Sequence, residues 1–530
     1  MLKRVNFREF FLVFSVIILI SVLFTLTYNQ ITDADGFYHI KHSWIYRQQG
    51  VLDSSFPWAQ YSVINQYSGD IWYGFHVLLL PFTFFSNLVS GIKIGSVAIM
   101  AGSLLLVWLA FHRLKFSAPL FWLLFFTFAS ADALYRFTTL RPHPISLALS
   151  LLIFSFLIVR LESPKKHFWV LLVIASVFSW VHLSMSWLPV LIVLTIGGIR
   201  LLKHQRPDYL SSFAVVLGLL VGWFARPNFW ETAKIAYIQI VQLFLSKDLP
   251  LRFGRELTPF VWENFVDQLI PITLFLLAGI SVLFYLMFRE RDGFFRNLFN
   301  CSTPALASLV LTAIFGYMSF GVARRSIEIF VGFAVIFLAS ISGLFLEKYP
   351  GFLKRVTSDI GKLALTGAVL TLLFFMAVKN IYRFSTYVPH SFDPRQLQEV
   401  SNWLKEHTRP GQIVFNIHWD RFAQLFFWND HNYYINGMDP IFQYAYSPEL
   451  YWKTHFYAID KATEFTCGEI RCTEEQLIST YEALKRDFKA SYLILEKRRN
   501  PELKKFLEGV RAPQFYVAIE TADEVLYYIK

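Results

Sequence analysis

The sequence has little charge and very little cysteine for its length. Only 16% of its 530 residues are Asp, Glu, Lys or Arg, and it contains 3 cysteines. Soluble domains carry about 25% charged residues, so a fold surrounded entirely by water is excluded for most of this chain. The low cysteine count excludes a disulfide-stapled scaffold and a cysteine-ligated metal cluster.

Hydrophobic residues make up 55% of the chain and aromatic residues 18%. Repeated apolar stretches of roughly 18–22 residues are long enough to cross a bilayer as helices. The first stretch is too long for a signal-peptide core and lacks a small-residue cleavage site, so we expect a retained span. The sequence predicts a polytopic α-helical membrane protein. Its apolar segments lie near residues 9–28, 71–90, 92–111, 117–133, 143–159, 168–183, 185–199, 211–225, 267–288, 303–322, 327–346 and 362–379.

The basic residues predict which loops face the cytoplasm. There are 49 Lys and Arg against 38 Asp and Glu, a formal net charge of +11, which in a membrane protein marks cytoplasmic loops rather than a nucleic-acid partner. All the basic clusters share one side if residues 71–90, which contain Pro81, do not cross. We therefore predict about 11 spans plus one half-embedded helix, with the N-terminus inside. The clusters are Lys3/Arg4/Arg8, Arg113/Lys115, Arg160/Lys165/Lys166, Arg200/Lys203/Arg206, Arg289/Arg291/Arg296 and Lys348/Lys354/Arg355/Lys362.

The composition changes after residue 380. Short apolar strands such as QIVFNI, SYLILE and EVLYYI alternate with amphipathic helices, which is typical of an α/β domain. We expect residues 1–380 to form a transmembrane domain, with residues 31–90 as its first outer loop, and residues 381–530 to form an outer domain. The expected location is the bacterial inner membrane, with a periplasmic C-terminal domain. The pair in CGEIRC, Cys467 and Cys472, is either two free thiols or a disulfide, and an outside location favours the disulfide.

Titratable residues crowd the segment ITDADGFYHIKH, directly after the first span. A single Asp at the end of a span is commonly a solvated cap, but Asp33 and Asp35 here stand together. If the chain is helical, Asp35 and His39 lie on one face. Such a cluster suits a hard divalent cation or a general base for an acceptor hydroxyl.

Several basic residues fall on the outer side, against the charge trend. A guanidinium at the water–lipid boundary can bind a phosphate with two parallel hydrogen bonds; snorkelling to lipid phosphates is the alternative explanation. Arg141 and His143 open one span in RPHP, near the outer acid Asp132, and GVARRSIEIF places Arg324 and Arg325 at a matching depth. The outer basic residues are Arg136, Arg141, Arg226, Arg324 and Arg325.

The segment NIHWDRFAQLFFWNDHNYYINGMDP, residues 416–440, is the most polar-aromatic part of the outer domain. After a strand ending at Ile417, Asp420 is expected to cap a helix, and Asp439 with Pro440 to start another. One interpretation is a cap with core aromatics. The other is a polar edge, including Trp419 and Asp420, that holds an acceptor.

The stretch DADGFYHIKHSWIYRQQG followed by FPW resembles the catalytic subunit of oligosaccharyltransferase and its bacterial and archaeal relatives, within the GT-C glycosyltransferases. Asp35, Phe37, Tyr38, His39 and Gly50 occupy the positions of that family's motif, and HWDRF is similar to a reduced form of its tryptophan–aspartate motif. The resemblance implies a polyprenyl-phosphate or polyprenyl-diphosphate sugar donor and transfer at the outer face. It also implies a Mg²⁺ or Mn²⁺ ion.

Two features depart from the family's pattern. The second outer loop carries Asp132 alone where the family has an acidic pair, and the full tryptophan–tryptophan–aspartate–tyrosine–glycine motif is absent. A membrane-embedded acceptor or a periplasmic glycan therefore fits better than protein asparagine.

The leading hypothesis is an inverting glycosyltransferase. Asp35, with Asp33, would deprotonate or orient the acceptor, and Asp35 with Asp132 would bind the metal. The donor phosphate would be bound by Arg141, His143, Arg324 and Arg325. The acceptor side would comprise Tyr38, His39, Asp70, Trp419 and Asp420. The alternatives are an oligosaccharyltransferase acting on protein, a lipid-glycan transporter or flippase, and a non-catalytic scaffold.

Overall fold

The computed structural model describes residues 7–288, 302–349 and 359–530. The chain forms two compact units, which are described separately. Unit 1 comprises Met1–Thr32, Lys93–Trp223 and Arg255–Ser391, and unit 2 comprises Asp33–Ile92, Phe224–Gly254 and Phe392–Lys530. Cys301 and several residues of the basic clusters, such as Arg289, Arg291 and Arg296, lie outside the described residues.

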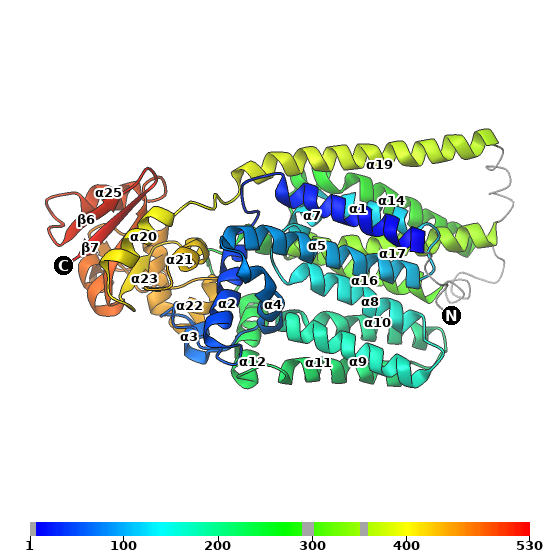
Figure 1. The fold of residues 1–530 in the computed structure, drawn as a ribbon, viewed down its shortest axis with the longest axis horizontal. Helices are drawn as coiled ribbons and strands as arrows, with labels where there is room; N and C mark the ends of the chain where they lie inside the picture. The colour runs from blue at the N-terminus through cyan, green and yellow to red at the C-terminus, as the bar shows by residue number, and fades with distance from the viewer. Residues whose placement is uncertain (1–6, 289–301, 350–358) are drawn as a thin grey trace. The chain divides into compact units, whose positions relative to one another are not determined.

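Unit 1 is a helical bundle. Its helices α8, α9, α10, α16 and α17 run side by side with nearly parallel axes (Figure 1). Several of them begin with a proline in the first turn, where its fixed φ and missing N–H cost nothing. The helices are α1 (Phe7–Leu26), α5 (Leu88–Arg113), α6 (Pro119–Phe128), α7 (Ala131–Phe137), α8 (His143–Ile158), α9 (Pro164–Val181), α10 (Trp187–Leu202), α11 (Tyr209–Phe224), α14 (Trp262–Phe288), α16 (Thr303–Gly321), α17 (Ile327–Lys348) and α19 (Asp359–Tyr387).

Charge and segment length predict about 11 membrane spans. The structure does not confirm that number. Among the described residues, 5 helices are long and apolar enough to cross a membrane, or up to 7 if each bent pair is one span. The apolar run 117–133 is one bent pair: α6 and α7 meet at 99°. Residues 71–90 form no single long helix, because the chain breaks into α4 (Tyr73–Leu78) and a 3₁₀ turn at Leu80–Phe84 that contains Pro81.

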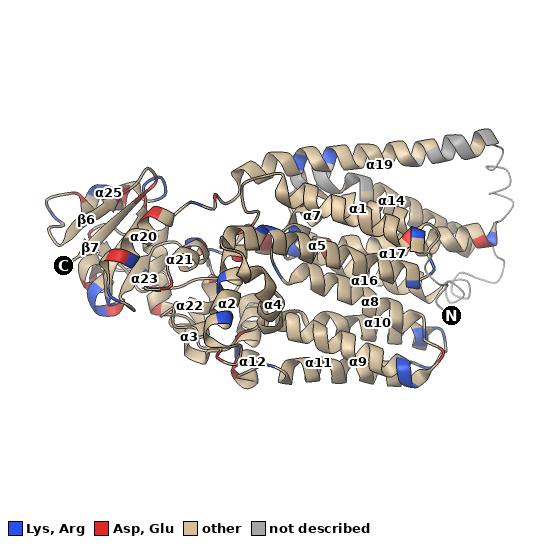
Figure 2. Cartoon of the chain, viewed as in Figure 1, with Lys and Arg blue, Asp and Glu red and all other residues tan. Residues whose placement is uncertain are grey.

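The basic ends of unit 1 agree with the predicted arrangement of the loops. Glu9 of α1 lines the same pocket, of about 800 Å³, as Arg113, Arg160 and Lys166. The first span and two basic loops therefore meet at one end of the bundle, as expected if residues 71–90 do not cross. Figure 2 shows few charges along the helices of unit 1 and several Lys and Arg at the end where α1 begins.

Unit 2 contains the predicted α/β fold. Its sheet has the strand order β2-β1-β5-β7-β6; β1 pairs in parallel with β2 and β5, and β7 pairs antiparallel with β5 and β6. The strands are β1 (Ile413–Asn416), β2 (Tyr433–Tyr434), β5 (Ala490–Glu496), β6 (Phe515–Glu520) and β7 (Glu524–Ile529), with a separate pair, β3 (Phe465–Thr466) and β4 (Ile478–Ser479). The helices are α2 (Asp35–Gln49), α3 (Val63–Tyr67), α4, α12 (Phe229–Tyr237), α13 (Leu243–Leu245), α20 (Gln398–His407), α21 (Phe422–Trp428), α22 (Pro440–Tyr446), α23 (Pro448–Ala458), α24 (Thr480–Glu482) and α25 (Pro501–Leu507).

Residues 33–90 of the predicted first outer loop belong to the same compact unit as the C-terminal sheet. Ala59 forms a parallel bridge with Tyr434 of β2, and the Tyr434 N–H donates to the Trp58 carbonyl at 2.8 Å. Helix α2 also packs against α21. The predicted domains, 1–380 and 381–530, are contiguous, whereas the observed units are not. Cys467 and Cys472 form the disulfide that an outside location favours.

Candidate functional site

The acidic motif starts helix α2. The Asp33 carboxylate accepts the backbone N–H of Asp35 at 3.0 Å, and the Asp33 carbonyl accepts the Gly36 N–H at 3.2 Å. At the other end, Gly50 adopts a φ of +99° that favours glycine, and its N–H donates to the Tyr46 carbonyl. The predicted helix, with Asp35 and His39 one turn apart, is confirmed. The Asp33 carboxylate already accepts a backbone hydrogen bond at the start of the helix, so Asp35 is the stronger candidate for chemistry.

The aromatic and histidine side chains that follow Asp35 enter the interior of unit 2. Tyr38 is 1% exposed and His39 is 2% exposed. The Tyr38 hydroxyl lies 3.0 Å from His42 Nδ1, and His39 Nδ1 lies 2.8 Å from His76 Nε2. Tyr38 and His39, expected on the acceptor side, are therefore part of a buried polar network.

Asp70 is the charged centre of that network. Its Oδ2 accepts hydrogen bonds from His76 Nδ1 at 2.6 Å and from the Tyr46 hydroxyl at 2.8 Å. Its Oδ1 accepts the Trp72 N–H at 2.9 Å, and Arg226 Nη1 donates to its backbone carbonyl at 3.1 Å. Burial alone would raise the pKa of the Asp70 carboxyl, but His76 and the other donors outweigh burial and hold that pKa well below its usual range. Asp70 is thus a fully hydrogen-bonded carboxylate.

The predicted phosphate-binding residues are gathered in unit 1 around two glutamates. Arg136 Nη1 contacts Glu256 Oε2 at 2.8 Å, and Arg136 Nε contacts Glu328 Oε2 at 2.6 Å. Arg141 Nη1 approaches Glu256 Oε2 to 3.2 Å. His143 Nε2 lies 3.0 Å from the Arg136 carbonyl and 3.6 Å from Glu328 Oε2. Arg141 and His143 therefore belong to one ionic cluster, and their binding of a donor phosphate stays a prediction.

The pair Arg324 and Arg325 adjoins this cluster. Both lie in a 3₁₀ turn, Arg324–Ser326, and the Arg324 N–H donates to the Thr258 carbonyl at 2.8 Å. The Arg324 guanidinium lies 5.6 Å from the centre of the Phe260 ring. Burial would raise the pKa of Glu256, but Arg141, Arg136 and Arg325 together hold that pKa well below its usual range. The turn that carries the arginine pair therefore lies close to the cluster around Glu256.

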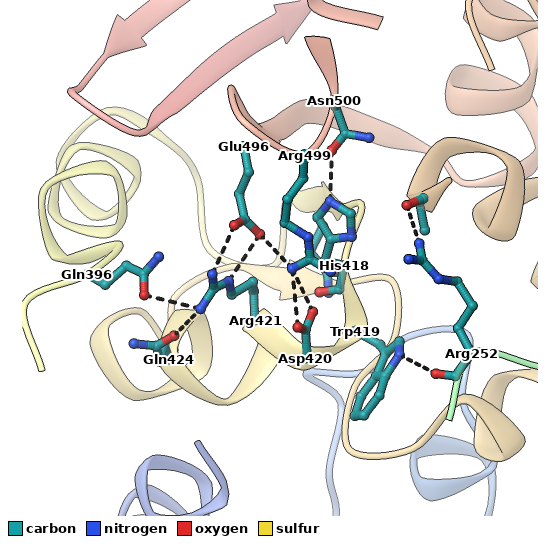
Figure 3. Close-up of polar contacts among 12 residues, drawn as sticks. Arg252, Gln396, His418, Trp419, Asp420, Arg421, Gln424, Glu496, Arg499 and Asn500 are labelled. Carbon is teal, nitrogen blue, oxygen red and sulfur yellow. Dashed lines mark hydrogen bonds and ion pairs between the residues drawn. The ribbon is translucent and has the colours of Figure 1, made fainter. Parts of the chain in front are cut away.

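Trp419 and Asp420 lie in a polar cluster of the sheet domain (Figure 3). The Trp419 indole N–H donates to the Arg252 carbonyl at 3.1 Å, and Asp420 Oδ1 accepts from Arg499 at 3.1 Å. The prediction that Asp420 caps a helix is wrong, because no side chain caps the turn Trp419–Arg421 or helix α21, and Asp420 pairs with Arg499 instead. The second predicted start is confirmed: the Asp439 carboxylate accepts the Ile441 N–H at the start of α22.

Asp35 and Asp132 are the predicted ligands of a Mg²⁺ or Mn²⁺ ion. These ions take several oxygen ligands in a regular arrangement. Asp35 belongs to unit 2 and Asp132 to unit 1, and the neighbouring Asp33 carboxylate serves the helix start. Within the described residues, one group of three potential ligands lies close together, His42, Asp70 and His76, and it contains neither Asp35 nor Asp132. The metal at Asp35 and Asp132 stays a prediction, and no step below uses it.

Four residues of these two networks were not predicted from the sequence. Glu328 follows the arginine pair at helical spacing in RRSIEIF, and His76 stands in GDIWYGFH, so each had a local signal. Glu256 and Tyr46 had no local signal, because their partners are far away in the chain. The four residues are Tyr46, His76, Glu256 and Glu328.

No protein-family model and no curated protein matches this sequence. Solved structures do match its fold. The oligosaccharyltransferase of Archaeoglobus fulgidus, tethered to an acceptor peptide containing the NVT sequon, has a TM-score of 0.58 at 13% identity, covering 99% of this chain and 74% of that one. ArnT from Cupriavidus metallidurans matches in the apo state (TM-score 0.55, 10% identity, 97% of both chains). It also matches bound to undecaprenyl phosphate (TM-score 0.54, 10% identity, 98% of both chains). The chain has the fold of these GT-C glycosyltransferases, as the DADGFYH motif suggested.

Proposed function

We propose that this protein is a membrane glycosyltransferase that moves a sugar or glycan from a polyprenyl-phosphate or polyprenyl-diphosphate donor to an acceptor at the outer face of the membrane. The fold is shared with two glycosyltransferases over nearly the whole chain, and one of them, ArnT, has been seen with undecaprenyl phosphate. The arginine cluster of unit 1 is the observation that carries the proposal.

That cluster brings several guanidinium groups together. Arg136 and Arg141 contact Glu256, and Arg136 also contacts Glu328. Arg325 helps to hold the pKa of Glu256 low, and Arg324 stands beside it in the same turn. A phosphate offers oxygens that match the planar donors of a guanidinium, so it is the ligand class that this cluster suits.

The chemistry follows from these assignments. The acceptor hydroxyl oxygen forms a bond to the anomeric carbon, while the bond from that carbon to the phosphate oxygen breaks and its electron pair goes to the phosphate. The acceptor proton passes to the Asp35 carboxylate, which acts as a general base. The arginines stabilise the charge that grows on the leaving phosphate. Trp419 and Asp420 are assigned to the acceptor side, and the configuration at the anomeric carbon inverts.

The test is transfer by the purified full-length protein in lipid nanodiscs. Radiolabelled polyprenyl-phosphate and polyprenyl-diphosphate sugars are supplied with a membrane extract, a periplasmic glycan or a sequon peptide. Arg141→Gln removes one guanidinium from the cluster and is expected to lower the transfer rate by roughly 10²–10³-fold. Lys234→Gln is the matched control, since Lys234 is half exposed, pairs with Glu231 on its own helix and lies over the Tyr67 ring, outside the arginine cluster.

Each outcome of this assay has a distinct meaning. Labelled product that depends on Arg141 supports the proposal, and the acceptor that becomes labelled identifies its class. A labelled peptide selects the oligosaccharyltransferase alternative, for which the Archaeoglobus relative with its acceptor peptide is the supporting observation. In sealed vesicles that contain the protein, donor that crosses the bilayer without being consumed would replace the proposal with a flippase.

A further inference from the structure

The pocket of about 800 Å³ in unit 1 is lined by basic residues from the ends of three helices. Arg113 is in the last turn of α5, Arg160 follows the end of α8, and Lys166 is in the first turn of α9. We propose that this pocket binds the phosphate group of an anionic phospholipid. None of these residues belongs to the arginine cluster that carries the proposed function, so the pocket is a separate site.

The guanidinium of Arg113 is held in place and still has donors to offer. Arg113 is 7% exposed, its Nη2 donates to the Val159 carbonyl at the end of α8, and its guanidinium lies 3.5 Å from the centre of the Phe156 ring. Its Nε is buried and has no hydrogen-bond partner among the described residues. A guanidinium has five N–H donors and no acceptor, and a buried donor left unpaired destabilises a protein. An anion in the pocket supplies the oxygen atoms that this group lacks.

Two helix N-termini also favour an anion in the pocket. Pro119 of α6 and Lys166 of α9 line it, each in the first turn of its helix. The first N–H groups of a helix carry partial positive charge and have no partners within the helix. The Ser163 side chain accepts the Lys166 N–H at the start of α9, whereas no side chain of the described residues caps α6. The start of α6 therefore keeps backbone donors for a phosphate.

The position of the pocket favours a lipid over a soluble phosphate compound. Glu9 and Arg113 lie at the ends of two helices that are long and apolar enough to cross a membrane, Phe7–Leu26 and Leu88–Arg113. Basic pockets at the ends of membrane helices lie at the depth of lipid headgroups. Apolar residues share the lining, as the acyl end of a lipid headgroup requires. These residues are Phe116, Pro119, Val159 and Leu161.

Helix α9 adds an exposed apolar surface beside Lys166. Trp169 and Val173 follow Lys166 by three and seven residues, on the same helical face, and they are 54% and 55% exposed. Val177 continues this surface one turn further along. Tryptophan is enriched where a membrane meets water. A lipid with its phosphate at Lys166 can extend its acyl chains along this surface.

Two carboxylates in the lining narrow the choice of headgroup. Glu9 and Glu162 both line the pocket. A carboxylate repels a phosphate but accepts hydrogen bonds from hydroxyl groups. A headgroup with hydroxyls beyond its phosphate therefore fits better than a bare phosphate. Phosphatidylglycerol has this combination and a net negative charge, whereas phosphatidylethanolamine and phosphatidylcholine are neutral overall.

Lipid binding by the purified full-length protein tests the proposal. Each of the three lipids, with the same acyl chains, is titrated into the protein in detergent micelles, and native mass spectrometry counts the bound lipid. We expect one phosphatidylglycerol per chain, with an apparent Kd about fivefold or more below that of either neutral lipid.

Lys166→Gln is the first variant, because Lys166 is exposed and its loss leaves the fold intact. Removing this charge from the pocket should raise the Kd for phosphatidylglycerol about fivefold. Lys165→Gln is the matched control. Lys165 is also exposed, in the same turn of α9, but is not among the residues that line the pocket. Its loss should change the Kd less than twofold.

Arg113→Gln tests the buried guanidinium. Gln keeps a neutral N–H donor but has no charge, so the Kd for phosphatidylglycerol should rise roughly 10-fold or more. Monodispersity and the thermal midpoint show whether this variant has folded. If it has not folded, the comparison of Lys166→Gln with Lys165→Gln decides the outcome.

Three results would overturn the lipid site. The first is equal binding of phosphatidylglycerol and the neutral lipids. The second is phosphatidylglycerol binding that Lys166→Gln weakens no more than Lys165→Gln, or that a folded Arg113→Gln leaves unchanged. The third is Arg113-dependent binding of radiolabelled inorganic phosphate in equilibrium dialysis without binding of phosphatidylglycerol, which would assign the pocket to a soluble phosphate compound. The assay needs no sugar donor, so the lipid site and the proposed function stand or fall separately.

Discussion

His418 shows how the surroundings of a single residue can make protein stability sensitive to pH. Its imidazole is 4% exposed, and Nε2 lies 2.7 Å from Asn500 Oδ1 (Figure 3). Burial, followed by the charge of Arg499, lowers the pKa of His418 to about 4. In the folded protein His418 is therefore neutral and donates its Nε2–H to the amide oxygen of Asn500.

We predict that His418 makes the folded protein less stable in acid. The unfolded chain binds the proton near pH 6.5, while the folded protein binds it only near pH 4. The contribution of His418 is complete above pH 6.5 and is lost as the pH falls toward 4, a change of up to roughly 3 kcal/mol. His418→Gln keeps a donor for Asn500 but does not titrate, so the thermal midpoint of this variant should fall less between pH 7 and pH 4.5.

An exposed histidine provides the matched control for this prediction. His407 is exposed and stacks on Trp403, so His407→Gln should follow the wild-type dependence on pH. Identical pH dependence in His418→Gln and wild type would refute the role assigned to His418.

At the scale of residues, the sequence predicts contacts within one helical turn but not contacts between residues far apart in the chain. The DADGFYH motif correctly places Asp35 and His39 on one helix, because helical spacing is a local property. The partnership of Asp70 with Tyr46 spans 24 residues across an irregular loop, and no periodicity connects them. The Arg136–Glu328 pair, 192 residues apart, could not be inferred for the same reason.

Helices α9 and α11 approach each other more closely than most helix pairs allow. A Cβ atom at Gly222 would overlap the backbone oxygen of Ser176, and one at Gly218 would overlap the Leu172 oxygen. Small residues permit such close backbone packing, which stabilises helix pairs where water is excluded. The two glycines therefore determine the separation of α9 and α11.

We predict that Gly222→Ala destabilises unit 1. The added methyl group must push α9 away or strain the helix, at a cost of about 1–3 kcal/mol for overpacking. The measurement is the thermal midpoint of the purified protein in detergent. Gly197→Ala in α10 is the control, because a Cβ atom there meets nothing within 4 Å. Equal midpoints for the two variants would contradict the close approach of α9 and α11.

At the scale of elements, hydropathy finds the helices and misses their bends. The run 117–133 was predicted as one span, but the chain turns by 99° between α6 and α7. The local cause is Ser130, whose side chain accepts the Ala133 N–H and starts α7. This cap is visible in the sequence ASAD, yet the strong apolar signal on either side outweighed it.

At the scale of the molecule, the sequence predicts the class of fold but not the division of the chain. The helical bundle and the α/β sheet were both expected from apolar length and strand alternation. The first outer loop was assigned to the membrane domain because it follows a span. In the structure Trp58 and Gln60 hydrogen-bond to β2, and such pairing of an isolated loop with a distant strand leaves no trace in composition. The likeness to known glycosyltransferases then rests on the whole chain instead of one motif.

The central claim is that Asp35 is the base of a glycosyl transfer from a polyprenyl-linked donor. The most direct measurement is the rate of sugar transfer by Asp35→Asn beside wild type, in nanodiscs, with the radiolabelled donor. Asn retains the shape of Asp but cannot accept the proton, so the rate should fall by roughly 10²–10⁴-fold. Asp53→Asn is the control, since the Asp53 carboxylate is exposed and is hydrogen-bonded by the neighbouring Ser55. Wild-type turnover in Asp35→Asn would contradict the account.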